Sequence, residues 1–283
     1  MTLRPRVYEF NFGSLRIACL LDATSVRTGL AKSFALGQPE DDVRQLATAN
    51  YVDPDRFEHH FIPLIIDTGA QKILFDTGLG APDGALLACL NEIGLAPSDV
   101  DIVVLTHGHP DHIGGLISCA ARVFGRARYV FGAAEFDFWM RGNGVRQERL
   151  ANRELFMRNC VSLADEATFV NPGQQVHSAL TAVDAAGHSP GLIAYRVQSN
   201  DRRMLIWSDT CLHYVLSLQR PDWHAAVDDE KERAVIARRR LLGMAADERL
   251  LVAGYHMPFP GLGFVERFES AFRWIPVSYQ LNI

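Results

Sequence analysis

The chain has 283 residues, 48% hydrophobic and 22% charged, and this composition is typical of a globular protein and excludes a disordered or fibrous chain. No apolar run reaches the roughly 18 residues of a membrane-spanning helix, and residues 1–10 lack the apolar stretch of a secretory signal. The net charge of −5 provides no overall positive field for a phosphate polymer. We therefore expect a cytoplasmic protein with no membrane or nucleic-acid partner. The one basic cluster, at residues 238–240, is interpreted as a solvated helix face.

Segments typical of strands alternate with segments typical of helices along the whole chain. This order predicts one layered α/β (α+β) body, a single domain over residues 1–283. In chain order we expect strands at 15–21, 61–66 and 72–75, a helix at 84–93, strands at 102–105 and 128–131, helices at 133–140 and 147–160, strands at 179–183, 192–197 and 204–207, a helix at 230–244, and a strand at 250–253.

One segment, at about residues 24–60, is polar and irregular in its pattern. It is too long for an ordinary connection within a compact domain. We interpret it as an insert that serves as a lid, a binding loop or an oligomer arm.

Polar and glycine-rich loops follow several of the predicted strands. Loops at one edge of a sheet can converge on a single cleft. The loops in question are 76–80, 106–115, 187–191, 208–210 and 254–256.

The loop after the predicted strand 102–105 holds three imidazoles and a carboxylate within six residues, namely His107, His109, Asp111 and His112. Zinc, iron, cobalt and manganese accept nitrogen and oxygen ligands of this kind. An ordinary turn with Asp111 capping a short helix would explain the aspartate, but it would not explain the three rings. The spacing favours two neighbouring metal positions over one.

Two metals need further ligands, and three candidates occur in the other strand-end loops. They are His188, Asp209 and His256, each close to a glycine or proline that permits a sharp turn. A lone histidine or aspartate in a loop is more often a cap or a surface residue. Together, however, the three would complete the site.

The string Thr106-His-x-His-x-Asp-His-x-Gly-Gly115, followed in order by His188, Asp209 and His256, resembles the signature of the metallo-β-lactamase superfamily. The resemblance implies a four-layer αββα sandwich and two divalent metal ions, most commonly zinc, with iron, cobalt or manganese as alternatives. It implies that His107, His109 and His188 hold one metal, that Asp111, His112 and His256 hold the other, and that Asp209 bridges them. It also implies that Asp76 orients the metal-binding loop from behind.

Within that family the C-terminal third is similar to the methyl parathion hydrolase and acyl-homoserine lactonase-like branch. The similarity rests on residues 205–213, 219–221, 237–242 and 255–263. The β-lactamases themselves generally lack a counterpart of Asp209, which disfavours antibiotic hydrolysis. Two departures are the absence of an export signal and Leu212 at a position where some lactonases have tyrosine.

The expected reaction is hydrolysis of an ester, lactone or phosphotriester bond by a metal-bridging hydroxide, with Asp209 and Asp111 at its centre. Two divalent cations lower the pKa of water toward about 7 and clamp the attacking and leaving oxygens. A glyoxalase II-like thioesterase and a non-catalytic metal-stabilised binding domain remain the alternatives.

Aromatic residues after the metal loop suggest a small uncharged organic substrate. The branch commonly places aromatic pocket walls here, so Trp139, Phe136 and Phe156 are candidate substrate contacts, with His213 as a polar contact. The alternative for the aromatic residues is an amphipathic helix packed on the core. Family analogy also suggests a homodimer formed through the insert.

Overall fold

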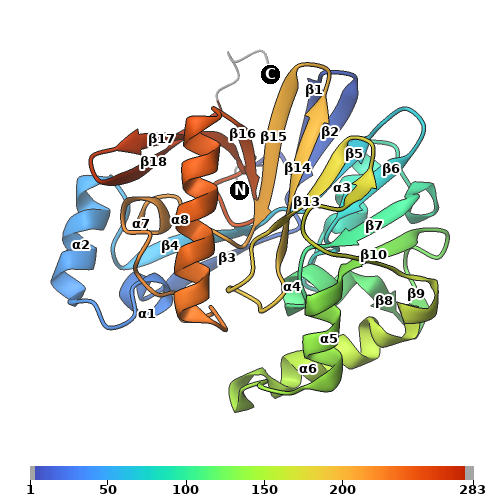
Figure 1. Cartoon of the computed structure of the whole chain (residues 1–283), viewed down its shortest axis with the longest axis horizontal. Coiled ribbons are helices and arrows are strands. Elements are labelled where there is room, and N and C mark those ends of the chain that lie inside the picture. Colours follow the sequence, from blue (N-terminus) through green and yellow to red (C-terminus); the bar gives the residue numbers. More distant parts are fainter. Residues whose placement is uncertain (1–3, 278–283) are drawn as a thin grey trace.

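The computed structural model describes residues 4–277 and places two seven-stranded sheets face to face. The strand orders are β1-β2-β5-β6-β7-β10-β11 and β12-β13-β14-β15-β16-β17-β18. Figure 1 shows the strands in the middle of the molecule, with α8 beside them and α5 and α6 at the lower end of the view. Side chains of α3, α5 and α6 pack on the first sheet in one apolar cluster. The four-layer αββα sandwich expected from the sequence is therefore confirmed.

The first sheet holds the parallel strands that carry the glycine- and histidine-rich loops. Strands β6, β7, β10 and β11 run parallel, while β1, β2 and β5 pair antiparallel. The strands are β1 (Val7–Phe12), β2 (Leu15–Leu20), β5 (Leu64–Asp67), β6 (Lys72–Phe75), β7 (Ile102–Leu105), β10 (Arg128–Gly132) and β11 (Thr168–Val170). The helices on its outer side are α3 (Leu86–Glu92), α4 (Pro110–Ile113), α5 (Ala133–Arg141) and α6 (Leu150–Asn159), with the short hairpin β8 (Ile117–Ser118) and β9 (Ala121–Arg122) and the 3-10 turns Pro97–Asp99, Gly114–Leu116, Gln147–Arg149 and Val161–Glu166.

The second sheet is mostly antiparallel and contains one parallel pair, β15 with β16. Its strands are β12 (Gln175–His177), β13 (Leu180–Asp184), β14 (Ile193–Ser199), β15 (Arg202–Ser208), β16 (Leu251–Gly254), β17 (Leu262–Phe268) and β18 (Ala271–Pro276). The helices that follow β15 are α7 (Leu216–Gln219) and α8 (Lys231–Asp247).

The layers follow from strands whose two faces are both apolar. In β7, Ile102 and Val104 belong to the core between the sheets, whereas Val103 and Leu105 belong to the core beneath the helices. Successive side chains point to opposite faces of a strand, so a continuous apolar run produces a strand buried on both sides. The same alternation in β15 divides its side chains between the inner core and the core beneath α8.

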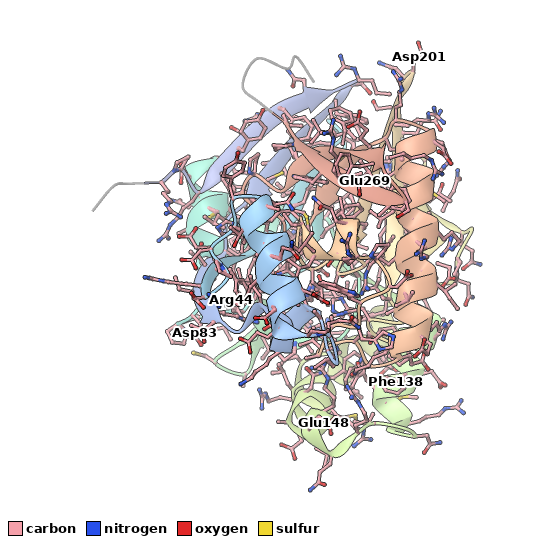
Figure 2. The ribbon with its side chains drawn as sticks, turned by 90° about the vertical axis from the view of Figure 1, so that its left-hand side faces the viewer. Arg44, Asp83, Phe138, Glu148, Asp201 and Glu269 are labelled. Atoms are coloured by element: carbon pink, nitrogen blue, oxygen red, sulfur yellow. The ribbon has the colours of Figure 1, made fainter. Side chains whose placement is uncertain are left out.

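The insert has regular secondary structure, although its sequence pattern is irregular. It contains β3 (Ala23–Thr28), α1 (Leu30–Phe34), α2 (Glu40–Ala49) and β4 (Arg56–Phe61). Three acidic residues open α2, where the helix dipole favours negative charge, and Val43, Leu46 and Ala47 bury its inner face. Figure 2 shows α2, with Arg44 labelled, on the face of the molecule turned toward the viewer.

The strand expected at 61–66 is divided in two. β4 ends at Phe61 in the two-stranded sheet with β3, and β5 begins at Leu64 in the first large sheet. Pro63 lies between them and has no backbone N–H to donate to a ladder. The insert is thereby joined directly to a strand of the core.

Within residues 4–277, no helix combines the length and the apolar character needed to cross a membrane. That the whole chain forms one domain, and that the insert acts as a lid or dimer arm, stay predictions. A single cooperative unfolding transition and the mass in solution would test them.

Candidate metal centre

The ends of strands from both large sheets converge on one point. The loop after β7 carries His107, His109, Asp111 and His112; His188 lies between β13 and β14; Asp209 follows β15; and His256 follows β16. The structure brings together all seven residues that the sequence predicted. They form two groups, within each of which the candidate ligand atoms lie within 4.8 Å of one another. We call them the three-histidine group (His107, His109 and His188) and the Asp–His group (Asp111, His112, Asp209 and His256).

In the three-histidine group, the outward-facing nitrogen of each ring is already bonded. Nε2–H of His109 donates to Asp229 (3.1 Å), Nδ1–H of His188 donates to Asp228 (2.9 Å), and Nδ1 of His107 lies 3.2 Å from the Thr106 hydroxyl. In neutral rings these bonds leave the inner nitrogens as lone pairs.

When the three rings carry their protons on the outer nitrogens only, the inner nitrogens of this group face one another as lone pairs. Nδ1 of His109 and Nε2 of His188 are 2.9 Å apart, and Nε2 of His107 is buried with no hydrogen-bond partner among the described residues. Facing lone pairs repel unless a cation lies between them. The group therefore fits a divalent metal that accepts imidazole ligands.

The Asp–His group places imidazole nitrogens around two carboxylates, of which Asp209 is buried and Asp111 is half-buried. Asp209 has one oxygen 3.3 Å from Nε2 of His112 and the other 2.9 Å from Nε2 of His256. Asp111 lies 3.5 Å from His112 and 3.4 Å from His256. The second Asp209 oxygen is also 3.3 Å from Nε2 of His188, so this one side chain reaches both groups.

The electrostatics of the two groups differ. Burial is the main cause that lowers the pKa of His109 to about 4, and burial likewise holds the pKa of His107 well below its usual range. Burial also disfavours charge on His256, but Asp209 and Asp111 outweigh it and raise its pKa to about 9. Positive charge beside the two carboxylates therefore stabilises them, and a divalent cation would supply it.

Asp76 contacts the outer ring nitrogen of His112 and so supports the Asp–His group, as expected from the sequence. Its carboxylate accepts hydrogen bonds from Nδ1–H of His112 (2.8 Å) and from the backbone N–H of Thr106 (2.8 Å). Asp76 has a φ of 61°, an unfavourable backbone conformation for a residue with a side chain. The hydrogen bonds hold the carboxylate there and fix the ring of His112.

Two further aspartates, which the sequence did not reveal, support the three-histidine group. Asp228 binds His188 and also accepts a hydrogen bond (2.8 Å) from Arg238, which is 1% exposed. Asp229 binds His109 and accepts a hydrogen bond from Arg149 (2.9 Å). The interpretation of residues 238–240 as a solvated face is thus wrong for Arg238, because α8 turns this side chain inward to the carboxylate.

Glu135 at the start of α5 joins the two histidine loops, and the sequence did not reveal it either. Its buried carboxylate accepts hydrogen bonds from the backbone N–H groups of Gly108 (2.8 Å) and Gly191 (2.8 Å), and from the side chains of Ser189 and Trp139. Burial raises the pKa of Glu135, while these donors favour the charged form. The carboxylate therefore holds the loops of His107 and His188 together.

The aromatic residues expected to contact substrate lie in the core instead. Trp139, Phe136 and Phe156 belong to the apolar cluster beneath the first sheet, and Trp139 is 0% exposed. A Cβ on Gly108 would lie 2.6 Å from the Trp139 ring, so the metal loop rests directly on this cluster. The expectation of aromatic pocket walls here is wrong, because the inner face of α5 packs against the loop. His213 is buried as well, with Nδ1 accepting N–H bonds from its own turn.

The cavity above the two groups has a volume of about 330 Å³. The walls come largely from the insert and from the segments that precede α7 and α8. Its lining comprises His109, Asp111, His188, Asp209 and His256 at the metal-ligand groups, and Arg27, Lys32, Ser33, Phe34, His59, Phe61, Leu79, Pro110, Arg149, Leu212, Ala226 and Val227 around them. His59 stacks on His256 with ring centroids 4.0 Å apart, and no paired spacing in the sequence identifies it.

A family model described as the metallo-beta-lactamase superfamily matches residues 64–210, slightly more than half of the chain. Among curated proteins, metallo-beta-lactamase domain-containing protein 1 of Mus musculus is 59% identical over 44 residues, which are 16% of this chain and 17% of that protein. Exodeoxyribonuclease WalJ of Streptococcus pneumoniae serotype 2 is 36% identical over 64 residues, 23% of each chain. The chain thus aligns with less than a quarter of the length of either relative.

Solved structures match over almost the whole chain. AidC, described as a dizinc quorum-quenching lactonase in complex with a product, has a TM-score of 0.88 at 24% identity, covering 97% of this chain and 98% of its own. The hydrolase AbOPH of the beta lactamase superfamily has a TM-score of 0.91 at 22% identity, covering 99% and 100%. At these identities the likeness establishes the fold.

Proposed function

The chain belongs to the metallo-β-lactamase superfamily, and from this premise we propose that it is a hydrolase of an ester or lactone bond that works with two divalent cations, most favourably zinc. The proposal places one cation at the three-histidine group and one at the Asp–His group. The lactonase-like branch is favoured because structures of acyl-homoserine lactone hydrolases share the fold, and the match to the lactonase AidC covers nearly the whole chain.

The observation that carries the proposal is the position of Asp209. One of its oxygens lies 3.3 Å from His112 in the Asp–His group, and the other lies 3.3 Å from His188 in the three-histidine group. A structural metal site is usually closed by four protein ligands. A carboxylate shared between two groups on the floor of a cavity is instead suited to two neighbouring cations with room for water and substrate.

Two cations held there would lower the pKa of water toward about 7 and so provide hydroxide at neutral pH. The protein contributes position and charge. Asp228 and Asp229 fix the His188 and His109 rings, and Asp76 fixes the His112 ring, so that their inner nitrogens face the centre. The apolar walls at Phe34 and Phe61 limit the water that shares the cavity with the substrate.

The test is a metal count followed by a substrate panel. We expect two metals per chain, and we expect the metal-replete protein to hydrolyse a chromogenic ester and an acyl-homoserine lactone, with activity lost on chelation and restored by zinc. S-Lactoylglutathione and paraoxon in the same panel test the thioesterase and phosphotriesterase alternatives. Two metals with no hydrolysis of any substrate would contradict the proposal and favour a metal-stabilised binding domain.

A homodimer through the insert stays a prediction. Light scattering coupled to size-exclusion chromatography of the metal-replete protein tests it directly.

A further inference from the structure

Outside the two metal-ligand groups, the charged side chains that line the cavity are all positively charged. Apart from the carboxylates of the Asp–His group, Arg27, Lys32 and Arg149 are the only acids or strong bases among residues 4–277 that line the cavity. The whole chain has the opposite balance, with 33 acidic against 28 basic residues. The part of the wall outside the two groups therefore carries only positive charges, although the protein as a whole is acidic.

Arg149 differs from the other two cations because its charge is already compensated. Its guanidinium donates to Asp229 at 2.9 Å and to the backbone carbonyl of Val227. It therefore acts as part of the support of His109. The uncompensated positive charges of the cavity wall are therefore those of Arg27 and Lys32, which both belong to the insert.

Among the described residues, neither Arg27 nor Lys32 has an acidic partner within 4.0 Å. The Arg27 guanidinium donates to the Ser25 hydroxyl (3.0 Å) and lies 5.8 Å from the centre of the Phe61 ring, which orients it without neutralising it. Two acids of the insert have other partners, since Glu58, which lies opposite Val26 in the β3–β4 ladder, pairs with Arg4 and Asp55 pairs with Arg44.

We propose that Arg27 and Lys32 bind an anionic group, a carboxylate or a phosphate, on the part of the substrate remote from the bond that is cleaved. A guanidinium and an ammonium that line the same cavity match such a group in charge and hydrogen bonding. The inference rests on the proposed hydrolase function and departs from the uncharged substrate expected from the sequence. Phe34 and Phe61 would cover the apolar part of the substrate between its two ends.

The first test measures binding without turnover. Calorimetry on the zinc-loaded protein compares hexanoate with adipate, in which a second carboxylate replaces the terminal methyl group, and extends to dicarboxylates from glutarate to suberate and to 6-phosphonohexanoate. We expect one chain length to bind about tenfold more tightly than its monocarboxylate at low salt, because a second charged contact forms. The gain should shrink at high salt. Preference for phosphonate or carboxylate identifies the anion.

Substitutions test whether Arg27 and Lys32 cause the gain in affinity for the dicarboxylate. Arg27→Met with Lys32→Met should abolish the gain, while Arg27→Lys and Lys32→Arg should keep most of it. Arg126→Met is the matched control, since Arg126 is exposed in the loop between β9 and β10 and does not line the cavity. Both wall cations are exposed, so the variants should keep the melting temperature of the parent.

The second test is kinetic and separates this inference from the proposed function. The mono-p-nitrophenyl ester of adipate should have a lower KM than p-nitrophenyl hexanoate, and the double variant should equalise them. Hydrolysis of both esters with equal KM, together with equal binding across the acid series, would overturn the anion site and leave the hydrolase standing. Tight dicarboxylate binding lost in the double variant, without hydrolysis of either ester, would overturn the hydrolase and leave the anion site standing.

Discussion

The three-histidine group and the Asp–His group obtain their negative charge in different ways. The Asp–His group contains its own two carboxylates, Asp111 and Asp209. The three-histidine group has none of its own, and Asp228 and Asp229 stand behind its rings. In the Asp–His group a carboxylate is itself a candidate ligand. In the three-histidine group a carboxylate orients a ligand. Loss of a carboxylate should therefore have different consequences in the two groups.

The largest effect is expected from Asp209→Asn, because within the described part of the chain this is the carboxylate that reaches both groups. The variant should fold, lose affinity for both metals, and lose turnover by orders of magnitude, since an amide oxygen carries no compensating charge. Metal content by mass spectrometry and turnover at saturating zinc would measure this. Unchanged turnover would show that Asp209 does not serve both metal groups, which would contradict the difference drawn between them.

Trp139→Ala tests the core beneath the three-histidine group. The Trp139 ring lies 5.9 Å from that of His109, and its indole N–H donates to Glu135. Truncation of a buried tryptophan costs about 3–5 kcal/mol of the free energy of unfolding. We expect a lower melting temperature and similar fractional losses on every substrate. A change in substrate preference with an unchanged melting temperature would instead show that Trp139 contacts the substrate.

Asp228→Asn and Asp76→Asn form a matched pair, one behind each group. Each should lower metal affinity about 10–100-fold, but only at its own group. Asp228→Asn should also lower the melting temperature more, because Arg238 is left buried without a counterion. Cadmium-113 NMR distinguishes a site with three nitrogen ligands from one with nitrogen and oxygen ligands. Equal loss at both groups in either variant would show that the supports do not act separately.

The sequence predicted the strands of the core well, since those at 72–75 and 102–105 match β6 and β7 in both bounds. Such strands are buried on both faces, so the apolar run itself marks them. β1, β17 and β18 were missed, because they mix aromatic and charged residues along exposed hairpins. Their stability depends on cross-strand pairing, which a local pattern does not reveal.

The candidate ligands were identifiable because four of them lie within six residues. Their supports were not, since each acts on a partner far along the chain. Asp228 is 40 positions from His188, and Glu135 is 56 positions from Gly191. A single acid near the start of a helix has the same sequence pattern whether it caps the helix, faces solvent or binds a histidine. Only the packing of α5 and α8 distinguishes these roles.

The smallest effect is expected from Tyr255→Phe, which perturbs the Asp–His group alone. The Tyr255 hydroxyl donates to the backbone carbonyl of Asp111, and its ring lies 4.0 Å from that of His112. The variant keeps the ring contact and removes the hydrogen bond, at a cost of about 1 kcal/mol. Metal affinity at the Asp–His group should fall by up to about fivefold. Affinity at the three-histidine group should stay unchanged, because its supports come from other loops.

Competition titrations with a chromophoric chelator measure the metal affinity of both groups. An equal loss at the two groups would show that the Asp111 backbone positions the whole loop.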